Sequence, residues 1–207
     1  MKLKETKKLF QGTYSYKLVV VTPFASKFRS RNLDNIFAYP QTAWYRPSDF
    51  EHVKKVINHL KKIENYSLRV EHPWLSIYSN SRQDLLALAN IDKAYIKYFY
   101  EPSVDLMPNQ IVMHDMPYHF KVTVGIGNNN LSSFIDWAKD NENFRIPRWS
   151  REQLSRDRRY VQSYFYAKDQ SNLLLAKIHL GSSIHKIETI VNKDQTKAQM
   201  YDPKYDK

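Results

Sequence analysis

The chain has 207 residues, and 32 lysines and arginines against 21 aspartates and glutamates give it a formal net charge of +11. It has no cysteine, which excludes disulfides, thiolate nucleophiles, iron–sulfur clusters and cysteine zinc sites. Without a signal peptide or an apolar run of about 18 residues, we expect a soluble cytoplasmic protein with no membrane partner.

The charge and proline pattern predicts five segments. Residues 1–15 are expected to form a basic N-terminal arm and 193–207 a charged C-terminal tail, because runs of like charge are commonly solvated. Two α+β units are expected at 16–101 and 118–192, each long enough to bury a modest core. A proline-punctuated linker at 102–117 joins them.

The first predicted unit opens with a strand over residues 16–22, which are rich in valine. Residues 24–47 have no regular period and predict a long insert, a kind of segment that often carries function. Ser48 and Glu51 then form a capping-box pattern, and the apolar residues that follow at helical spacing predict a helix.

Shorter elements complete this unit. Two strands are predicted at 68–71 and 75–78, on either side of a proline-containing reversal. Ser81 begins a second capping-box pattern and predicts another helix. A strand at 94–100 closes the unit, so the order is strand, insert, helix, two strands, helix, strand.

The second predicted unit follows a similar order. Strands are expected at 119–124, 163–166 and 184–191, with amphipathic helices over 131–138 and 173–178. Both units alternate strands and helices as β-α-β-(β)-α-β, with helices on one face of a small antiparallel or mixed sheet. We therefore predict an α+β fold made of two tandem ferredoxin-like units.

A faint internal repeat connects the two units. Leu-Ser-Ile-Tyr at 75–78, followed by a leucine pair, recurs 88 positions later as Ser-Tyr-Phe-Tyr at 163–166, again followed by two leucines. The same shift carries Ile96 onto Ile184. This spacing indicates an internal duplication, although such a common order of elements could also align by chance.

Two segments interleave positive charge with aromatic residues, the insert at 24–47 and the stretch 145–160. Arginine contacts phosphates and stacks on bases, and an aromatic face stabilises an unpaired base by about 1–3 kcal/mol. Six arginines oppose two acidic residues in 145–160, a local charge of +4. The predicted contact residues are Lys27, Arg29, Arg31, Trp44, Tyr45, Arg46, Arg145, Arg148, Trp149, Arg151, Arg156, Arg158 and Arg159.

The leading hypothesis is a non-catalytic protein that binds RNA or single-stranded DNA, since high positive charge favours a polyanionic partner. Trp44 and Trp149 could instead be core anchors among solvated arginines. Protein interfaces use the same residue types, so a viral or phage assembly protein or a homo-oligomer is a second hypothesis. A metal-independent ribonuclease using His114 or His119 is a third.

The other motifs are weaker. Tyr78 and Tyr166 occupy positions comparable to the base-stacking aromatics of RNA-binding ferredoxin-like sheets, but we expect ordinary cross-strand packing. The histidines show no metal-ligand spacing, and the G-x-G that begins at Gly125 lacks the third glycine of a dinucleotide loop. No cofactor or metal site is predicted.

Overall fold

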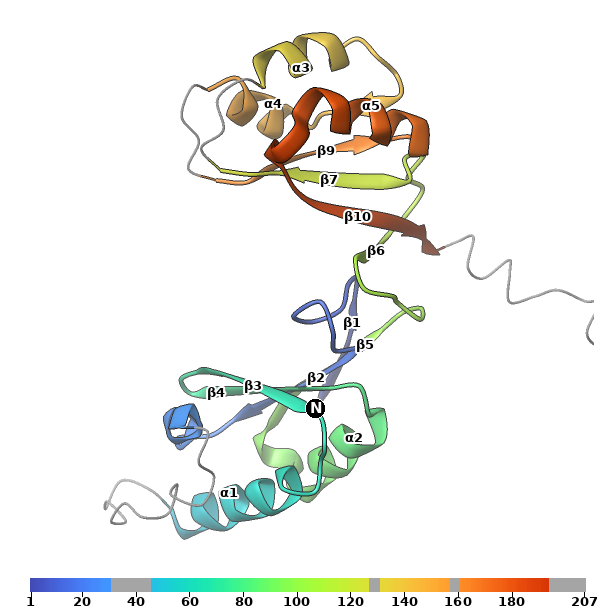
Figure 1. Ribbon diagram of the computed structural model, residues 1–207. Helices are drawn as coiled ribbons and strands as arrows, with labels where there is room; N and C mark the ends of the chain where they lie inside the picture. The colour runs from blue at the N-terminus through green and yellow to red at the C-terminus, as the bar shows by residue number, and fades with distance from the viewer. Residues whose placement is uncertain (31–45, 127–130, 157–160, 194–207) are drawn as a thin grey trace, which may run out of the picture. The chain divides into compact units, whose positions relative to one another are not determined.

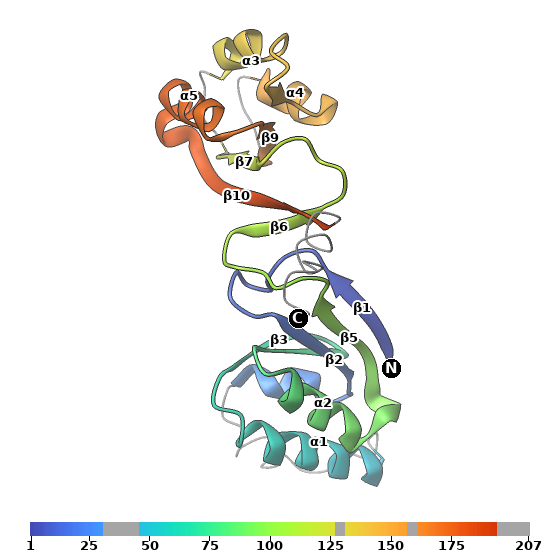
Figure 2. The same ribbon diagram turned by 90° about the vertical axis from the view of Figure 1, so that its right-hand side faces the viewer.

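The computed structural model describes residues 1–30, 46–126, 131–156 and 161–193 (Figure 1). The chain divides into two compact units, which we call unit 1 (Met1–Pro108) and unit 2 (Asn109–Lys207). Each unit contains a five-stranded mixed sheet whose helices lie on one face, as Figures 1 and 2 show. The prediction of two tandem ferredoxin-like α+β units is therefore confirmed.

Unit 1 has a ferredoxin-like order with one strand added. Its elements are β1 (Lys2–Thr6), β2 (Tyr16–Val21), the 3₁₀ helix η1 (Ala25–Ser30), α1 (Pro47–Leu60), β3 (Tyr66–Glu71), β4 (Trp74–Ser79), α2 (Arg82–Ile91), the 3₁₀ helix η3 (Lys93–Tyr95) and β5 (Ile96–Pro102). The strand order is β1-β5-β2-β4-β3, in which β1 is parallel to β5 and the other neighbours are antiparallel.

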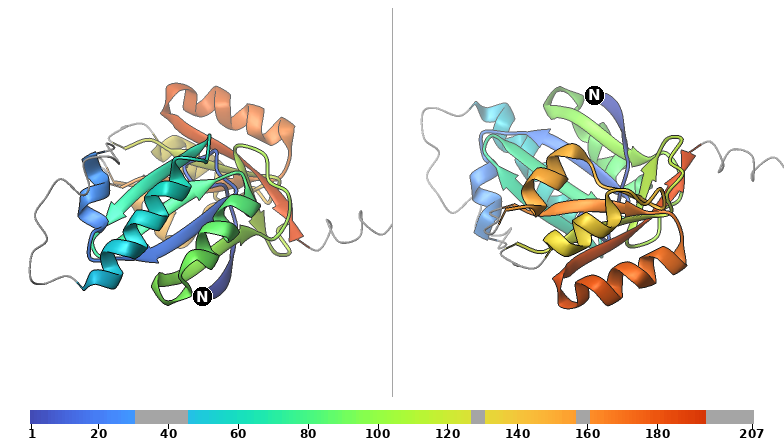
Figure 3. Two further views of the ribbon diagram at one scale, coloured as in Figure 1. Left: turned by 90° about the horizontal axis from the view of Figure 1, so that it is seen from below. Right: turned by 90° about the horizontal axis from the view of Figure 1, so that it is seen from above.

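Unit 2 repeats this topology. Its elements are β6 (Gln110–Met113), β7 (Phe120–Val124), α3 (Ser132–Ala138), β8 (Phe144–Arg145), α4 (Arg148–Leu154), β9 (Ser163–Ala167), α5 (Gln170–Leu180), the 3₁₀ helix η4 (Gly181–Ser183) and β10 (Ile184–Asn192). The order β6-β10-β7-β9-β8 matches unit 1 strand for strand, including an edge strand, β6, that is parallel to the last strand. Figure 3 shows the helices of each unit lying across their own sheet.

The 88-residue repeat extends to the details of strand pairing. Lys17 pairs with Tyr78 between β2 and β4, and Lys121 pairs with Tyr166 between β7 and β9. Both closing strands also contain a bulge, because the register skips Lys97 in β5 and His185, 88 positions later, in β10. Shared register and a shared bulge favour an internal duplication over a chance alignment.

Each core lies between the sheet and the helices. In unit 1, alternation along the strands buries Leu18, Ile77 and Phe99 against the apolar stripe of α1. In unit 2, Val122 and Phe165 occupy the corresponding side of the central strands. No helix of the described residues lies on the opposite face of either sheet, so the alternate residues of the strands point away from the helices.

Helix α1 begins two residues earlier than the Ser48 pattern predicts, since that pattern makes Ser48 the N-cap. Arg46 is the N-cap residue and Pro47 the first helical residue. The Asp49 carboxylate accepts a hydrogen bond from the backbone N–H of Arg46 at 3.1 Å. Proline suits the first helical position because its missing N–H would have no partner there, and this preference decides the boundary.

Three strands lie where no strand is predicted from the sequence. β1 lies within the predicted arm 1–15, β6 within the predicted linker 102–117, and β8 has two residues. Four of the five residues of β1 are exposed, so backbone pairing with β5 holds it and no apolar pattern marks it. Residues 194–207 of the predicted tail lie outside the described part of the chain.

The described helices include none with the length and apolar character needed to cross a bilayer.

Candidate nucleic-acid interface

The described members of the predicted contact set are divided between the two units and, within each unit, between different elements. Lys27 and Arg29 lie on η1 beside β3, whereas Arg46 begins α1. Arg145 lies on β8, opposite Tyr166. The remaining described members, Arg148, Trp149, Arg151 and Arg156, lie in or directly after α4. Five others, Arg31, Trp44, Tyr45, Arg158 and Arg159, lie outside the described residues.

Helix α4 presents its charged side to solvent. It packs against β9 through buried Ser150 and Leu154. Arg148 is 94% exposed and pairs with Glu152 at 3.2 Å, and Trp149 is 48% exposed. Trp149 is therefore not a core anchor. The contact role predicted for these residues stays a prediction.

A denser combination of aromatic and cationic residues lies on the helix-free face of unit 1. Strand register places its members on the side of the sheet opposite the core. We call this set the aromatic–lysine face: Lys2, Lys4, Lys17, Arg69, Glu71, Trp74, Tyr78, Lys97, Tyr98 and Tyr100. Five cationic groups and one carboxylate give this face a net charge of +4.

Two half-buried rings form the open end of the aromatic–lysine face. Trp74 and Tyr98 stack with centroids 6.1 Å apart and an interplanar angle of 28°. Lys97 Nζ lies 4.0 Å from the Trp74 ring centroid, and Lys4 Nζ lies 3.9 Å from that of Tyr98. The bulge at Lys97 explains this arrangement, because it places two consecutive residues on the same face of β5.

The other end of this face is closed by the segment between β1 and β2. The Phe10 ring lies 5.6 Å from that of Tyr78 and 5.8 Å from that of Tyr100. Tyr78 is only 4% exposed, so it is a packing residue. Burial lowers the pKa of Lys17, whose Nζ lies 5.3–5.8 Å from the centroids of these three rings; Glu71 opposes that shift.

Unit 2 carries different side chains in the same positions. Lys186 and Glu188 stand 88 positions after Tyr98 and Tyr100. Glu188 is 4% exposed and accepts a hydrogen bond from Lys186 Nζ at 2.6 Å, with Lys121 Nζ 3.9 Å away. Glu188 therefore offsets one of the two lysine charges beside it.

Apolar side chains cover most of the rest of that face. Met116, Tyr166 and Ile190 form a buried cluster against which Ile111 and Tyr118 pack. The helix-free face of unit 2 consequently has no exposed pair of stacked rings among its described residues.

Titratable groups form one further cluster in unit 1. Arg46, His72 and Tyr95 line a cavity of about 470 Å³, and the Tyr95 hydroxyl donates a hydrogen bond to Asp49 at 2.5 Å.

His114 and His119, the ribonuclease candidates, are exposed in unit 2. Within the described ranges, no three histidine, aspartate or glutamate side chains come together to hold a metal ion.

Comparison with known proteins places no relative beside this chain: no family model, no curated protein and no solved structure matches it.

Proposed function

We propose that this protein binds single-stranded nucleic acid, RNA or DNA, through the aromatic–lysine face of unit 1 and does so without catalysis. The observation that supports the proposal is the stacked pair Trp74 and Tyr98, half-buried between Lys4 and Lys97 on a helix-free sheet. Aromatic rings stack on unpaired bases whatever their sequence, and lysines around them attract the phosphates.

The energies of the competing contacts favour exchange of an ammonium group for a base. A lysine over an exposed ring contributes about 0.5–1 kcal/mol, whereas a stacked base contributes about 1–3 kcal/mol. A base that displaces Lys4 or Lys97 from its ring also frees that ammonium group to contact a phosphate. Binding thus replaces two weak internal contacts by stacking and charge pairing.

A single strand suits this face better than a duplex. Strand register places the two rings on a face of the sheet, and base faces are accessible only where bases are not stacked within a double helix. We therefore expect the affinity for an unstructured oligonucleotide to exceed that for a duplex of the same length.

Fluorescence anisotropy with a labelled strand of about ten nucleotides tests the proposal. The double variant Trp74→Ala/Tyr98→Ala should weaken binding by roughly 100-fold, because it removes two stacking interactions of about 1–3 kcal/mol each. The salt dependence of the affinity should be the same in this variant as in the unmodified protein. Lys4→Gln/Lys97→Gln should instead make the negative slope of log K against log salt shallower by about 1.4, the value for two lost phosphate contacts on a single strand.

The control is a matched charge change on α4. Arg148→Gln/Arg151→Gln removes two exposed cations from the surface that the sequence favours, and we expect little change in affinity or salt slope. Circular dichroism would verify that each variant is folded. If the α4 variant loses binding while Trp74→Ala/Tyr98→Ala keeps it, the proposed face is wrong.

A further inference from the structure

Among the described residues, no strand lies beside the outer edge of β3. β3 is the edge strand of the unit 1 sheet, and within this part of the chain it pairs only with β4, without a bulge. Thr22 N–H donates to the Pro73 carbonyl at 2.9 Å, so Pro73 and alternate residues after it bond toward β2. The residues between them, starting at Trp74, must bond toward β3.

This alternation identifies the free groups of β3. The partners of Trp74, Ser76 and Tyr78 are the inward-bonded residues of β3, namely Glu71, Arg69 and Ser67. Tyr66, Leu68 and Val70 consequently point their N–H and C=O groups away from the sheet. In the described part of the chain, the N–H and C=O groups of these three residues form no backbone hydrogen bond to any segment outside the sheet.

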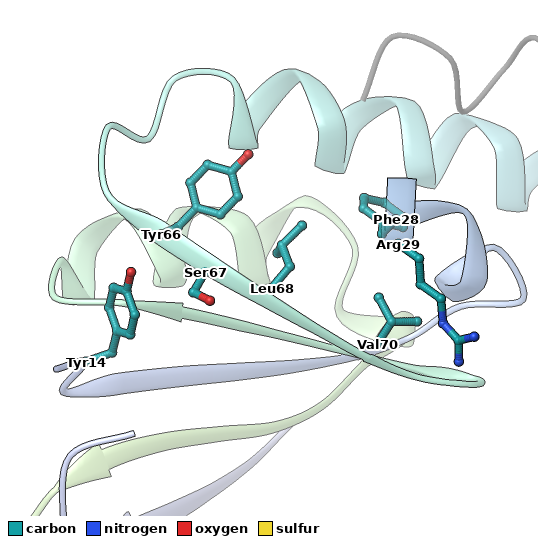
Figure 4. A pocket seen from close by; sticks show the side chains of 7 residues that line it. All are labelled: Tyr14, Phe28, Arg29, Tyr66, Ser67, Leu68 and Val70. Atoms are coloured by element: carbon teal, nitrogen blue, oxygen red, sulfur yellow. The ribbon is translucent and has the colours of Figure 1, made fainter. Parts of the chain in front are cut away.

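A groove runs along this edge, and Figure 4 shows the side chains around it. Its volume is about 530 Å³. It is lined by Tyr14, Phe28, Arg29, Tyr66, Ser67, Leu68 and Val70. Arg29 and Tyr14 lie at opposite ends of it, and η1 holds Phe28 in the core while leaving Arg29 exposed.

We propose that this edge groove binds an extended, acidic peptide segment of a partner protein, which adds a strand beside β3 with a carboxylate next to Arg29. A strand offers alternating donors and acceptors, and this is what the free groups of Tyr66, Leu68 and Val70 require. The sugar-phosphate backbone of a nucleic acid lacks the regular alternation of N–H donors and carbonyl acceptors that a strand offers, and no residue that lines the groove belongs to the aromatic–lysine face.

The charge favours a different protein over a second copy of this chain. The net charge is +11, so two copies repel each other. If the β3 strands of two copies paired antiparallel about a two-fold axis at Leu68, Val70 of one copy would lie opposite Tyr66 of the other. Arg29, which lies near Val70, would then face Tyr66 and no carboxylate. An acidic segment removes both objections.

The groove also defines a pattern for the bound segment. Side chains of a strand alternate between the two faces, so every second residue would lie toward Phe28, Leu68 and Val70 and should be apolar. The residues between them would face solvent and can be polar.

The probe is a labelled synthetic peptide of alternating valine and threonine with one terminal aspartate, made with the aspartate at either end. Hydrogen exchange followed by NMR on the full chain is the main measurement. Without peptide, the amides of Tyr66, Leu68 and Val70 should exchange much faster than those of Ser67 and Arg69. With peptide, all five should be protected; no change at saturating peptide would overturn the proposal.

Two modified peptides test the backbone ladder without altering the protein. Methylating the alternate peptide nitrogens that face β3 should abolish binding, while methylating the others should leave it within about twofold. Equal binding of both peptides would contradict strand addition. Arg29→Glu should weaken binding of the aspartate peptide about tenfold, consistent with the loss of one charge-assisted contact. The same variant should bind a peptide with lysine in place of that aspartate more tightly.

Competing occupants give different results. Dimerisation that protects the same three amides in sedimentation and exchange experiments would make a second copy the occupant and overturn the proposal. Protection by an oligonucleotide would overturn it as well. Peptide binding that leaves oligonucleotide affinity unchanged would support the edge groove whether or not the proposed nucleic-acid function holds.

Discussion

Units 1 and 2 share a backbone plan and differ in what they place on the helix-free face of the sheet. The strand order, the Lys–Tyr pair between the central strands and the bulge in the last strand are the same in both. On that common frame, unit 1 displays Tyr98 and Tyr100, whereas unit 2 has Lys186 and Glu188. Binding capacity can therefore differ between units of one architecture.

The two faces also differ in how they satisfy their charges. In unit 2, Glu188 accepts from Lys186 and lies near Lys121, so its cations have an acidic partner within the sheet. In unit 1, Lys4 and Lys97 lie over aromatic rings, a weaker contact that a ligand can replace. Unit 1 is thus the better candidate for an external anion.

The largest expected effect comes from truncating one buried ring in each core. Phe99 in unit 1 and Phe165 in unit 2 are fully buried, each in a core cluster of its own. Phe99→Ala and Phe165→Ala should each cost about 3–5 kcal/mol. Chemical denaturation followed by residue-resolved NMR should show each variant weakening its own unit; a loss below about 1 kcal/mol would contradict this packing.

High pH should weaken unit 2 through Tyr166. Burial, followed by its interactions with Tyr164, raises the pKa of Tyr166 to about 12. The unfolded chain loses this proton first, near pH 10, so the stabilisation is complete below about pH 10 and is lost as pH rises toward 12. Tyrosinate absorbance should show a late-titrating group that Tyr166→Phe removes; its persistence in that variant would refute the assignment.

Low pH should weaken unit 1 through His52. This side chain is 2% exposed and stacks on Tyr95 at 3.9 Å, and neither ring nitrogen has a hydrogen-bond partner among the described residues. Burial lowers the pKa of His52, although Asp92 and Asp49 oppose that effect. The folded state therefore binds this proton less readily than the unfolded state, whose histidine has a pKa of about 6.5.

The sign follows from that difference. The stability of unit 1 should be fully present above about pH 6.5 and should fall as the solution becomes more acidic. His52→Phe keeps a flat ring against Tyr95 and removes the titrating group, so its denaturation midpoint should depend less on pH between about 8 and 5. An identical pH profile in the variant would show that another group is responsible.

The sequence was sufficient for the elements that bury an apolar pattern. Helix α1 and strands β4 and β9 carry such patterns, and the 88-residue repeat predicted the common architecture. Strands β1 and β6 were missed because they are edge strands held by backbone bonds. The aromatic–lysine face was missed because Lys4, Trp74 and Tyr98 are far apart in the chain and meet only through strand pairing.

A usable signal was present in the alternation of two strands. In 74–78 and 97–100, Trp74 and Tyr98 alternate with residues that face the core. Alternation alone therefore places both rings on the side of the sheet opposite the core. Their proximity to Lys4 could not be derived, because β1 itself gave no signal.

The smallest expected effect separates the two units most cleanly. Glu71 pairs with Arg69 on the aromatic–lysine face, and Glu152 pairs with Arg148 on α4; all four side chains are more than half exposed. Exposed ion pairs of this kind contribute about 0.2–1 kcal/mol, so Glu71→Gln and Glu152→Gln should change stability little and similarly. Only Glu71→Gln removes a negative charge from the proposed binding face. We expect it to tighten oligonucleotide binding by a few-fold at low salt, with the difference fading as salt screens the charge, while Glu152→Gln leaves affinity unchanged. Anisotropy titrations of the two variants at two salt concentrations would measure this, and an equal gain in both would mean that net charge, and not the face of unit 1, governs binding.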